Sequence, residues 1–235
     1  MEARNDRMMN ENMEHISPAL PDQKNYEVSY GLAFKLASQK LLAFVNLEEQ
    51  CQKSDSIYRN DGKSACIELK YLNRGYRICL PEVSVAFADS AEEVELRDKI
   101  LIMHYITQAK GTALANSKIA FKELKEGANY YPTYFQRAVK PLVDHFGKTP
   151  EKLVELAQEI GGYKTDLGDT AVTIPAFSRV PITLVLWSGD EEFPSEANIL
   201  FDGTVLDYLA AEDLIILCQT ISWKLVKLQQ MKKQA

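Results

Sequence analysis

Residues 66–80 read CIELKYLNRGYRICL, and this stretch decides the fold class. Apolar and polar residues alternate on both sides of Asn73-Arg74-Gly75, which is the pattern of two half-buried strands joined by a turn. Gly75 tolerates the positive φ that such a turn needs. We therefore predict a β-hairpin near residues 65–80, with Val83–Phe87 as a candidate third strand.

Helical periodicity replaces this alternation on both sides of the hairpin. Five apolar residues upstream recur at steps of three and four: Tyr30, Phe34, Ala37, Leu41 and Phe44. This spacing places them on one face of a helix. Downstream, the capping box Ser90-Ala91-Glu92-Glu93 predicts a helix that runs to about Lys110. Its second half, Ile100–Ile106, is apolar almost all round, so we expect burial on most sides.

The second half of the chain contains further helices, two strands and a long C-terminal helix. The strands are Thr170–Phe177 and Pro181–Trp187, and the apolar, β-branched character of the second predicts a central strand. The last helix begins near Asp213. Strands and helices do not alternate regularly, which favours an α+β fold over a doubly wound sheet.

We expect a single α+β domain over residues 26–235, preceded by a disordered tail over residues 1–25. Its small antiparallel sheet would combine Ala65–Phe87 with Thr170–Trp187 and be covered by several helices. The segment Gly189–Asp202 would be a tight, irregular connection, with Phe193 and Phe201 turned inward.

Composition excludes several classes of protein. The formal net charge is −6, which argues against nucleic-acid binding because such binding needs a basic face. No apolar run reaches the roughly 18 residues needed to cross a bilayer, and the N-terminus lacks an apolar signal core. We therefore expect a cytoplasmic protein with no membrane contact.

Catalytic signatures are absent, and the sequence assigns no reaction. It contains no glycine-rich phosphate loop, no nucleophile elbow and no zinc-protease motif. The cysteines, Cys51, Cys66, Cys79 and Cys218, are widely spaced and form no local iron–sulfur or zinc motif. We interpret them as small hydrophobic residues in a reducing compartment.

His104 is the most unusual ionisable residue because it stands inside the apolar run Leu101–Ile106. A buried imidazole needs a hydrogen-bond partner, and a haem iron or another metal is one possible partner. We therefore select His104, its neighbour Tyr105 and His145 as candidate cofactor-binding residues. A satisfied core histidine at position 104, and a helix-end role for His145, are the alternatives.

Acidic residues accumulate between Arg179 and Lys224, where no lysine or arginine occurs. Clustered carboxylates without cations suit a divalent metal ion or a basic partner surface. The candidate metal ligands are Asp190, Glu191, Glu192 and Asp202. The alternatives are helix and turn capping by these acids, and docking of a partner protein on residues 190–213.

The same region carries a family resemblance. The motifs are WSGDEEFP at residues 187–194, ILFD at 199–202, YLAAED at 208–213, IMHYI at 102–106, and FKEL at 121–124. Together with Gly161-Gly162 they resemble domain of unknown function family 3786, over roughly Tyr26 to Leu228.

This resemblance implies a setting rather than a reaction. Members of the family occur in bacteria and archaea, largely anaerobes, and are often joined to corrinoid-type iron–sulfur modules; no cysteine precedes residue 26 here. The resemblance implies an accessory domain in anaerobic redox or one-carbon metabolism. We expect this domain to bind a cofactor or another ligand, with haem or a corrinoid as the first class to test. A carboxylate-based divalent-metal enzyme and an acidic protein-interaction module are the alternatives.

Overall fold

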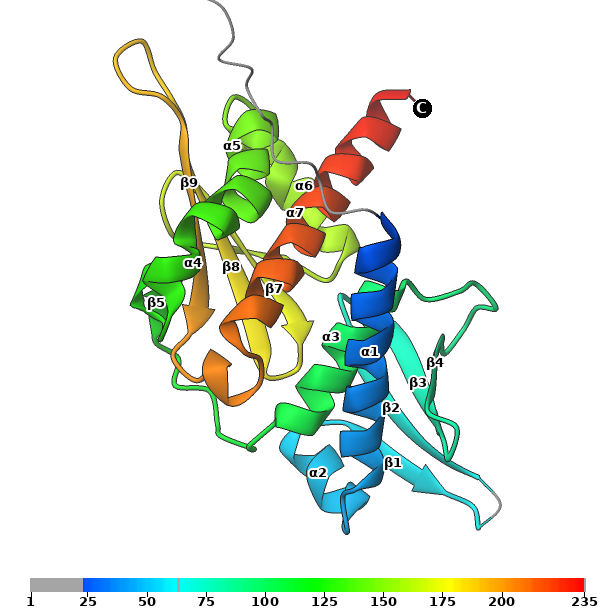
Figure 1. The fold of residues 1–235 in the computed structure, drawn as a ribbon. Coiled ribbons are helices and arrows are strands. Elements are labelled where there is room, and N and C mark those ends of the chain that lie inside the picture. The colour runs from blue at the N-terminus through cyan, green and yellow to red at the C-terminus, as the bar shows by residue number, and fades with distance from the viewer. Residues whose placement is uncertain (1–22, 63, 235) are drawn as a thin grey trace, which may run out of the picture.

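The computed structural model describes residues 23–62 and 64–234 and has an α+β architecture, as the sequence predicts (Figure 1). The helices are α1 (Gln23–Leu42), α2 (Leu47–Lys53), α3 (Leu96–Gln108), α4 (Gly127–Tyr134), α5 (Lys140–Phe146), α6 (Glu151–Glu159) and α7 (Ala211–Gln234). Shorter helical turns are η1 (Phe121–Glu123), the π-helical η2 (Phe135–Val139) and η3 (Val205–Asp207). The predicted tail over residues 1–22 lies outside the described residues, and residues 23–25 belong to α1.

The strands form two antiparallel sheets rather than the one sheet we predicted. The first sheet has the order β1-β2-β3-β4, and the second has the order β5-β9-β8-β7-β6. Their bounds are β1 (Ile57–Asn60), β2 (Ala65–Tyr71), β3 (Arg74–Leu80), β4 (Ser84–Phe87), β5 (Lys118–Ala120), β6 (Tyr163–Thr165), β7 (Thr170–Phe177), β8 (Val180–Trp187) and β9 (Glu196–Asp202). The predicted central strand is confirmed, because β8 lies between β7 and β9.

Helices cover one side of each sheet and meet between them. In Figure 1, α1 and α3 lie against the first sheet, while α7 crosses the second sheet together with α4, α5 and α6. The helix α3 contacts both α1 and α7, and residues Ile100–Met103 and Tyr105–Thr107 are buried. This confirms that its second half is enclosed on most sides, and it places α3 at the centre of the protein.

The β2–β3 hairpin is present, but its turn differs from the predicted one. The turn residues are Leu72 and Asn73, both with positive φ (46° and 62°), which is the two-residue turn that matches the twist of paired strands. Leu72 is 3% exposed, and its N–H donates to the carbonyl of Ala176 in the second sheet at 2.9 Å. Gly75 instead lies in β3, where an added Cβ would approach Ala88 to 3.2 Å.

The capping box at Ser90 does not begin a helix. The Ser90 hydroxyl accepts the N–H of Glu92 at 3.0 Å in a local turn, and α3 begins only at Leu96. Val94, between them, is 2% exposed. The chain is therefore non-helical up to Val94, whose side chain packs in the core. This packing outweighs the local capping signal at Ser90.

Among the described residues, no helix combines the length and the apolar character needed to cross a lipid bilayer.

Candidate functional site

His104 on α3 pairs with Asp213 on α7. The Nδ1 atom of His104 lies 2.8 Å from Oδ1 of Asp213, and the second carboxylate oxygen accepts a hydrogen bond from the Gln108 amide at 3.2 Å. His104 and Gln108 are one helical turn apart, so both side chains reach the same carboxylate. Asp213 stands in the first turn of α7, where the helix dipole favours a negative charge.

This arrangement determines which imidazole nitrogen is available. An ionised Asp213 accepts a hydrogen bond from Nδ1–H, so Nε2 keeps its lone pair in the neutral ring. The imidazole is 26% exposed and the carboxylate 8%, and Nε2 has no hydrogen-bond partner among the residues that the structure describes. A carboxylate behind a histidine in this way orients metal-binding imidazoles. His104 can therefore accept a hydrogen bond or a proton, or donate its lone pair to a metal ion, through Nε2.

Tyr105, the second predicted cofactor residue, belongs to the core. Its hydroxyl donates to the carbonyl of Ser54 at 2.6 Å and accepts the N–H of Arg179 at 3.4 Å. Its ring stacks on Phe177 at a centroid distance of 4.1 Å, and burial raises the pKa of the phenol. These contacts join α3 to the end of α2, to β7 and to the β7–β8 turn, which is a structural role.

His145, the third predicted cofactor residue, lies elsewhere. It is on α5, with its ring edge against Trp223 and its carbonyl accepting the amide of Gln229. Trp223 follows Asp213 by ten residues on α7, a separation of about 15 Å at the rise of an α-helix. The three predicted cofactor residues therefore do not converge on one ligand.

The four predicted metal ligands are also separated. Asp190, Glu191 and Glu192 lie in the β8–β9 loop, whereas Asp202 ends β9, which pairs with β8 from Trp187↔Glu196 to Ile182↔Phe201. Six residues of strand between Glu196 and Asp202 span about 20 Å. Within residues 23–62 and 64–234, no three His, Cys, Asp or Glu side chains are grouped so that they could hold a metal ion.

Asp202 is occupied by structural hydrogen bonds. Its carboxylate accepts the backbone N–H groups of Ala115 (2.9 Å), Asn116 (2.8 Å) and Thr204 (3.0 Å), and the Thr204 hydroxyl (2.7 Å). Burial acts to raise its pKa, and these hydrogen bonds lower it more strongly, so the net pKa is below its usual value. Asp202 thereby fixes the loop before β5 to the end of β9.

The remaining acids of the 190–213 segment divide into two groups. Near the start of α7, Asp207 pairs with Lys110 (2.8 Å), and Glu212 accepts the hydroxyl of Tyr130 (3.0 Å). At the far end, Glu191, Glu192 and Glu196 make no ion pair within the described part of the chain. The unpaired charge is therefore concentrated on the β8–β9 hairpin.

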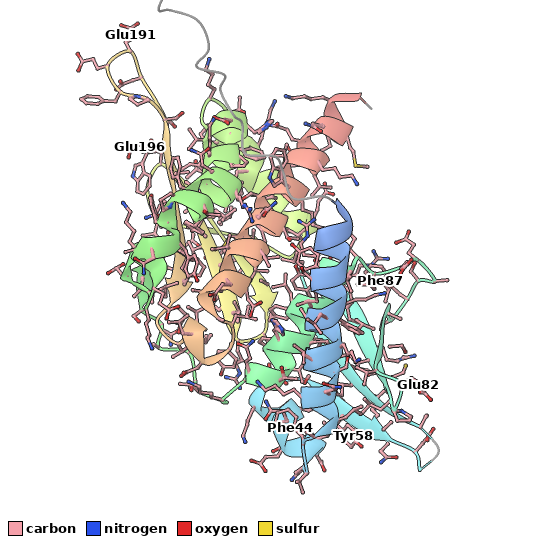
Figure 2. The ribbon with its side chains drawn as sticks, viewed as in Figure 1. Phe44, Tyr58, Glu82, Phe87, Glu191 and Glu196 are labelled. Atoms are coloured by element: carbon pink, nitrogen blue, oxygen red, sulfur yellow. The ribbon has the colours of Figure 1, made fainter. Side chains whose placement is uncertain are left out.

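Residues 187–196, here called the acidic hairpin tip, project from the body of the protein (Figures 1 and 2). Glu191 is at its far end and Glu196 is closer to the sheet (Figure 2). Phe193 is 67% exposed, so the prediction that it turns inward is wrong, whereas Phe201 at 1% is buried as predicted. The predicted irregular segment also contains β9, because pairing with β8 extends residues 196–202.

A local turn holds the acidic hairpin tip in shape. Oδ1 of Asp190 accepts the N–H groups of Phe193 (2.7 Å) and Glu192 (2.8 Å), and the Asp190 N–H donates to the carbonyl of Phe193 (2.9 Å). The hydrogen bonds from Phe193 and Glu192 lower the pKa of the Asp190 carboxyl. Asp190 therefore acts as a turn cap, and the exposed side chains of its neighbours are presented on a fixed backbone.

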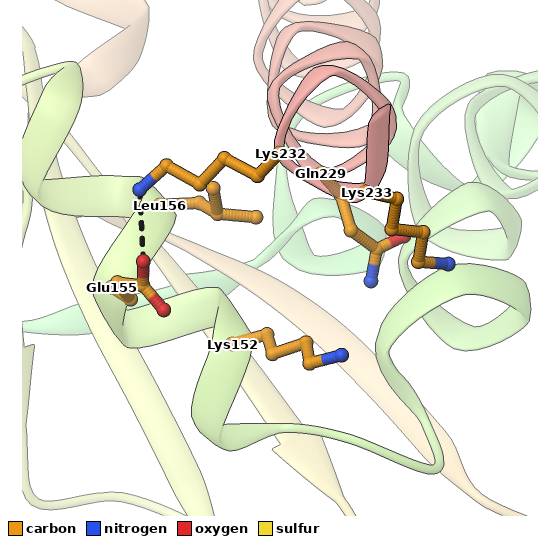
Figure 3. Close-up of a pocket in the computed structure, with 6 residues that line it drawn as sticks. All are labelled: Lys152, Glu155, Leu156, Gln229, Lys232 and Lys233. Atoms are coloured by element: carbon orange, nitrogen blue, oxygen red, sulfur yellow. Dashed lines mark hydrogen bonds and ion pairs between the residues drawn. The ribbon is translucent and has the colours of Figure 1, made fainter. Parts of the chain in front are cut away.

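Two pockets lie away from the predicted residues. One, of about 300 Å³, is lined by Lys152, Glu155 and Leu156 of α6 and by Gln229, Lys232 and Lys233 of α7 (Figure 3). Lys232 closes one side by pairing with Glu155 (2.8 Å) and Glu159 (2.6 Å). The other pocket, of about 490 Å³, is formed by the loop between β6 and β7. Neither pocket is lined by His104, Tyr105 or His145.

Sequence reasoning missed the partners of His104. Asp213 is 109 residues away from it along the chain, and the sequence distinguishes it in no way from the other acids of residues 190–213. Gln108, one turn after His104, was the only local signal available, since residues four apart share a helix face.

The fold and these sites define an α+β protein with two antiparallel sheets around a central helix. The chain belongs to the family described as Domain of unknown function (DUF3786), whose model matches residues 46–223. The match begins after α1 and includes both sheets, His104, Asp213 and the acidic hairpin tip. No curated protein and no solved structure matches the chain.

Proposed function

We propose that this protein is an accessory protein that binds a basic partner protein through the acidic hairpin tip. The observation that carries the proposal is the combination of two exposed aromatic residues, Phe193 (67%) and Trp187 (40%), with unpaired carboxylates on a projecting hairpin. Aromatic side chains supply much of the binding energy in protein interfaces, and charged neighbours steer association.

The turn at Asp190 supports this proposal on energetic grounds. A flexible loop must be ordered when it binds, which costs about 0.5–1.5 kcal/mol for each immobilised side chain. Here two N–H groups bonded to Asp190 hold the backbone before any partner arrives. The Phe193 side chain is 67% exposed and so contributes little to the core, in contrast to the buried Phe201.

The complementary surface must carry an apolar socket and basic groups. Glu191, Glu192 and Glu196 have no cation of their own within the described residues, so a partner's lysine or arginine side chains would supply their counter-charges. The cytoplasm, and the anaerobic redox or one-carbon metabolism that the resemblance implies, are the proposed setting.

A photo-crosslinking residue at position 193, in cells of the natural host, tests the proposal. We expect one crosslinked partner that disappears when Glu191 and Glu192 are both replaced by lysine. Position 82, at the turn between β3 and β4 on the first sheet (Figure 2), is the matched control for an exposed hairpin residue. Equal products from positions 193 and 82, or products unaffected by charge reversal, would contradict the proposal.

A second candidate function is ligand binding at His104. It is favoured by the Asp213 carboxylate behind Nδ1, which leaves Nε2 free to bind. The site fits ligation by one imidazole nitrogen, but not an enclosed slot for a macrocycle, because the neighbours Met103 and Tyr105 are packed in the core.

Haem and a corrinoid are the first probes for this second candidate. We expect a spectral shift on titration that is lost in His104→Ala and kept in His145→Ala. A shift that persists in His104→Ala, with the fold retained, would remove His104 as the ligand.

A further inference from the structure

We propose that Cys66 and Cys79 form a redox-active dithiol that reduces a small anionic disulfide and itself becomes a cross-strand disulfide. Cys66 on β2 and Cys79 on β3 are direct partners in the register of the first sheet. Both thiols are free and partly exposed, whereas Cys51 and Cys218 are buried (1% and 0% exposed). This activity is independent of the acidic hairpin tip, which lies on the other sheet.

The hydrogen-bond pattern of β3 shows that the two cysteines form a close pair. Residues opposite each other in an antiparallel ladder alternate between hydrogen-bonded pairs and closer, non-hydrogen-bonded pairs. Gly75 accepts the N–H of Ala88 at 2.9 Å, so its backbone groups point towards the β4 side and away from β2. By the two-residue period of a strand, Arg77 and Cys79 point the same way.

The pair Cys66↔Cys79 is therefore non-hydrogen-bonded. The two-residue turn leads to the same conclusion, because the flanking pair Tyr71↔Arg74 closes the turn and the pairs alternate from there. Cα atoms of such a pair are about 4.5 Å apart. Disulfides span Cα separations of about 4.4–6.8 Å, so the bond can form without a shift in register.

Both thiols lie on the outer face of the sheet. Ile67, Leu69 and Tyr71 are buried on β2, so the alternating residues Cys66 and Glu68 face outwards. On β3, Tyr76 and Ile78 are buried in the same way and Cys79 faces outwards. A small reagent can therefore reach the pair without unfolding the protein.

The surroundings of the pair are basic. Arg59 is the partner of Cys66 on β1, and Arg77 precedes Cys79 by two residues on the same face. Glu68 binds both guanidinium groups, at 2.9 Å to Arg59 and 3.4 Å to Arg77, and so neutralises one of the two charges. The hydrogen bond and the charge interaction with Glu68 are the main causes that raise the pKa of Arg59. The nearby Cys66 makes a smaller contribution in the same direction.

The net positive charge next to the thiols attracts a disulfide that carries carboxylates. The substrate class is thus a low-molecular-weight anionic disulfide, for which oxidised glutathione is the probe.

The reaction is a balanced thiol–disulfide exchange. One cysteine thiolate attacks a sulfur of the small disulfide, forms a mixed disulfide and releases the first small thiolate. The second cysteine then attacks the mixed disulfide, forms the Cys66–Cys79 bond and releases the second small thiolate. The two protein thiols give up two electrons and two protons, which the small disulfide receives as it becomes two thiols.

The test uses the full chain, reduced and freed of reductant, in buffers of graded ratio of oxidised to reduced glutathione. Free thiols are alkylated in the folded state, and the linked peptides are identified by mass spectrometry. We expect the two accessible thiols to disappear together, with one peptide pair joined through Cys66 and Cys79. Cys51 and Cys218 should react only after unfolding.

Three variants distinguish this chemistry from non-specific oxidation. Cys66→Ser and Cys79→Ser should each accumulate a glutathione adduct on the remaining cysteine and form no internal bond. Arg59→Gln should slow the reaction several-fold with oxidised glutathione but not with the neutral disulfide of 2-mercaptoethanol. Separate adducts on Cys66 and Cys79 in the unsubstituted protein, or no thiol loss under conditions that modify either serine variant, would overturn the proposal.

Discussion

Asp202→Asn tests whether the buried acid that ends β9 is structural. The side chain is 7% exposed and accepts four hydrogen bonds, from Ala115, Asn116 and Thr204. Asparagine keeps the size and shape of the side chain but replaces one acceptor oxygen by an NH₂ group. That group would face the Asn116 N–H, so two donors would oppose each other, and the other three bonds would lose their ionic character.

The magnitude follows from these contacts. A hydrogen bond to a charged group contributes about 1.5–3 kcal/mol, and one such bond is lost outright. We expect the free energy of unfolding at pH 7 to fall by about 2–3 kcal/mol. For a chain of this size, that corresponds to a fall in Tm of about 4–12 °C.

The effect should depend on pH. Because its hydrogen bonds outweigh burial, Asp202 has a lower pKa in the folded protein than in the unfolded chain. Its contribution is therefore complete above the unfolded pKa of about 3.9 and is lost as the pH falls through the lower folded pKa. The difference between the two proteins should be constant from neutral pH to about 5 and shrink below about 4.

Urea denaturation followed by circular dichroism at several pH values measures this difference. Asp207→Asn is the matched control, because that carboxylate is 31% exposed and pairs with Lys110 at the surface. We expect its cost to stay below about 1 kcal/mol. An unchanged midpoint for Asp202→Asn, or a chelator that destabilises the original protein but not this variant, would refute the structural role.

Three further predictions concern stability and are measured in the same way. Phe201→Ala should cost about 3–5 kcal/mol by leaving a cavity, whereas Phe193→Ala should stay within about 0.5 kcal/mol; equal costs would contradict their different burial. Burial raises the pKa of Asp98, so its ionised form destabilises the folded state above that pKa; Asp98→Asn should be more stable than the original protein at pH 7, and the gain should vanish below the unfolded pKa. Tyr105→Phe leaves the carbonyl of Ser54 without its buried donor and should cost about 1–3 kcal/mol, and no loss would show that water replaces the hydroxyl.

Much of the secondary structure could be predicted because its signals are local. The alternation on both sides of residue 73 predicts β2 and β3, and the apolar, β-branched residues of Pro181–Trp187 predict the central strand β8. Local signals failed where tertiary packing outweighed them. The capping box at Ser90 is a turn because Val94 is buried before the helix starts, and Glu196–Asp202 is a strand because β8 pairs with it.

The candidate site was predictable only in part. The apolar surroundings of His104 marked it as unusual. Its hydrogen bond to Asp213, which fixes its tautomer, could not be predicted because the two residues are 109 positions apart in the sequence. The acids at 190–192 were grouped with Asp202 because the sequence places them close together, whereas β9 extends between them. Sequence proximity misled here because a strand separates its ends by about 3.3 Å per residue.

By itself, the sequence determined that this protein has an α+β fold, with a hairpin over residues 65–80, a buried α3 and a long C-terminal helix. Each of these rests on a periodicity that a short segment carries alone. Tertiary structure decided that the turn falls at Leu72 and Asn73, since the Leu72 N–H reaches Ala176 on the second sheet. A turn at residues 73–75 would have changed the register, and with it the residue opposite Cys66. That two free thiols face each other is thus a consequence of a contact between sheets, which no local pattern encodes.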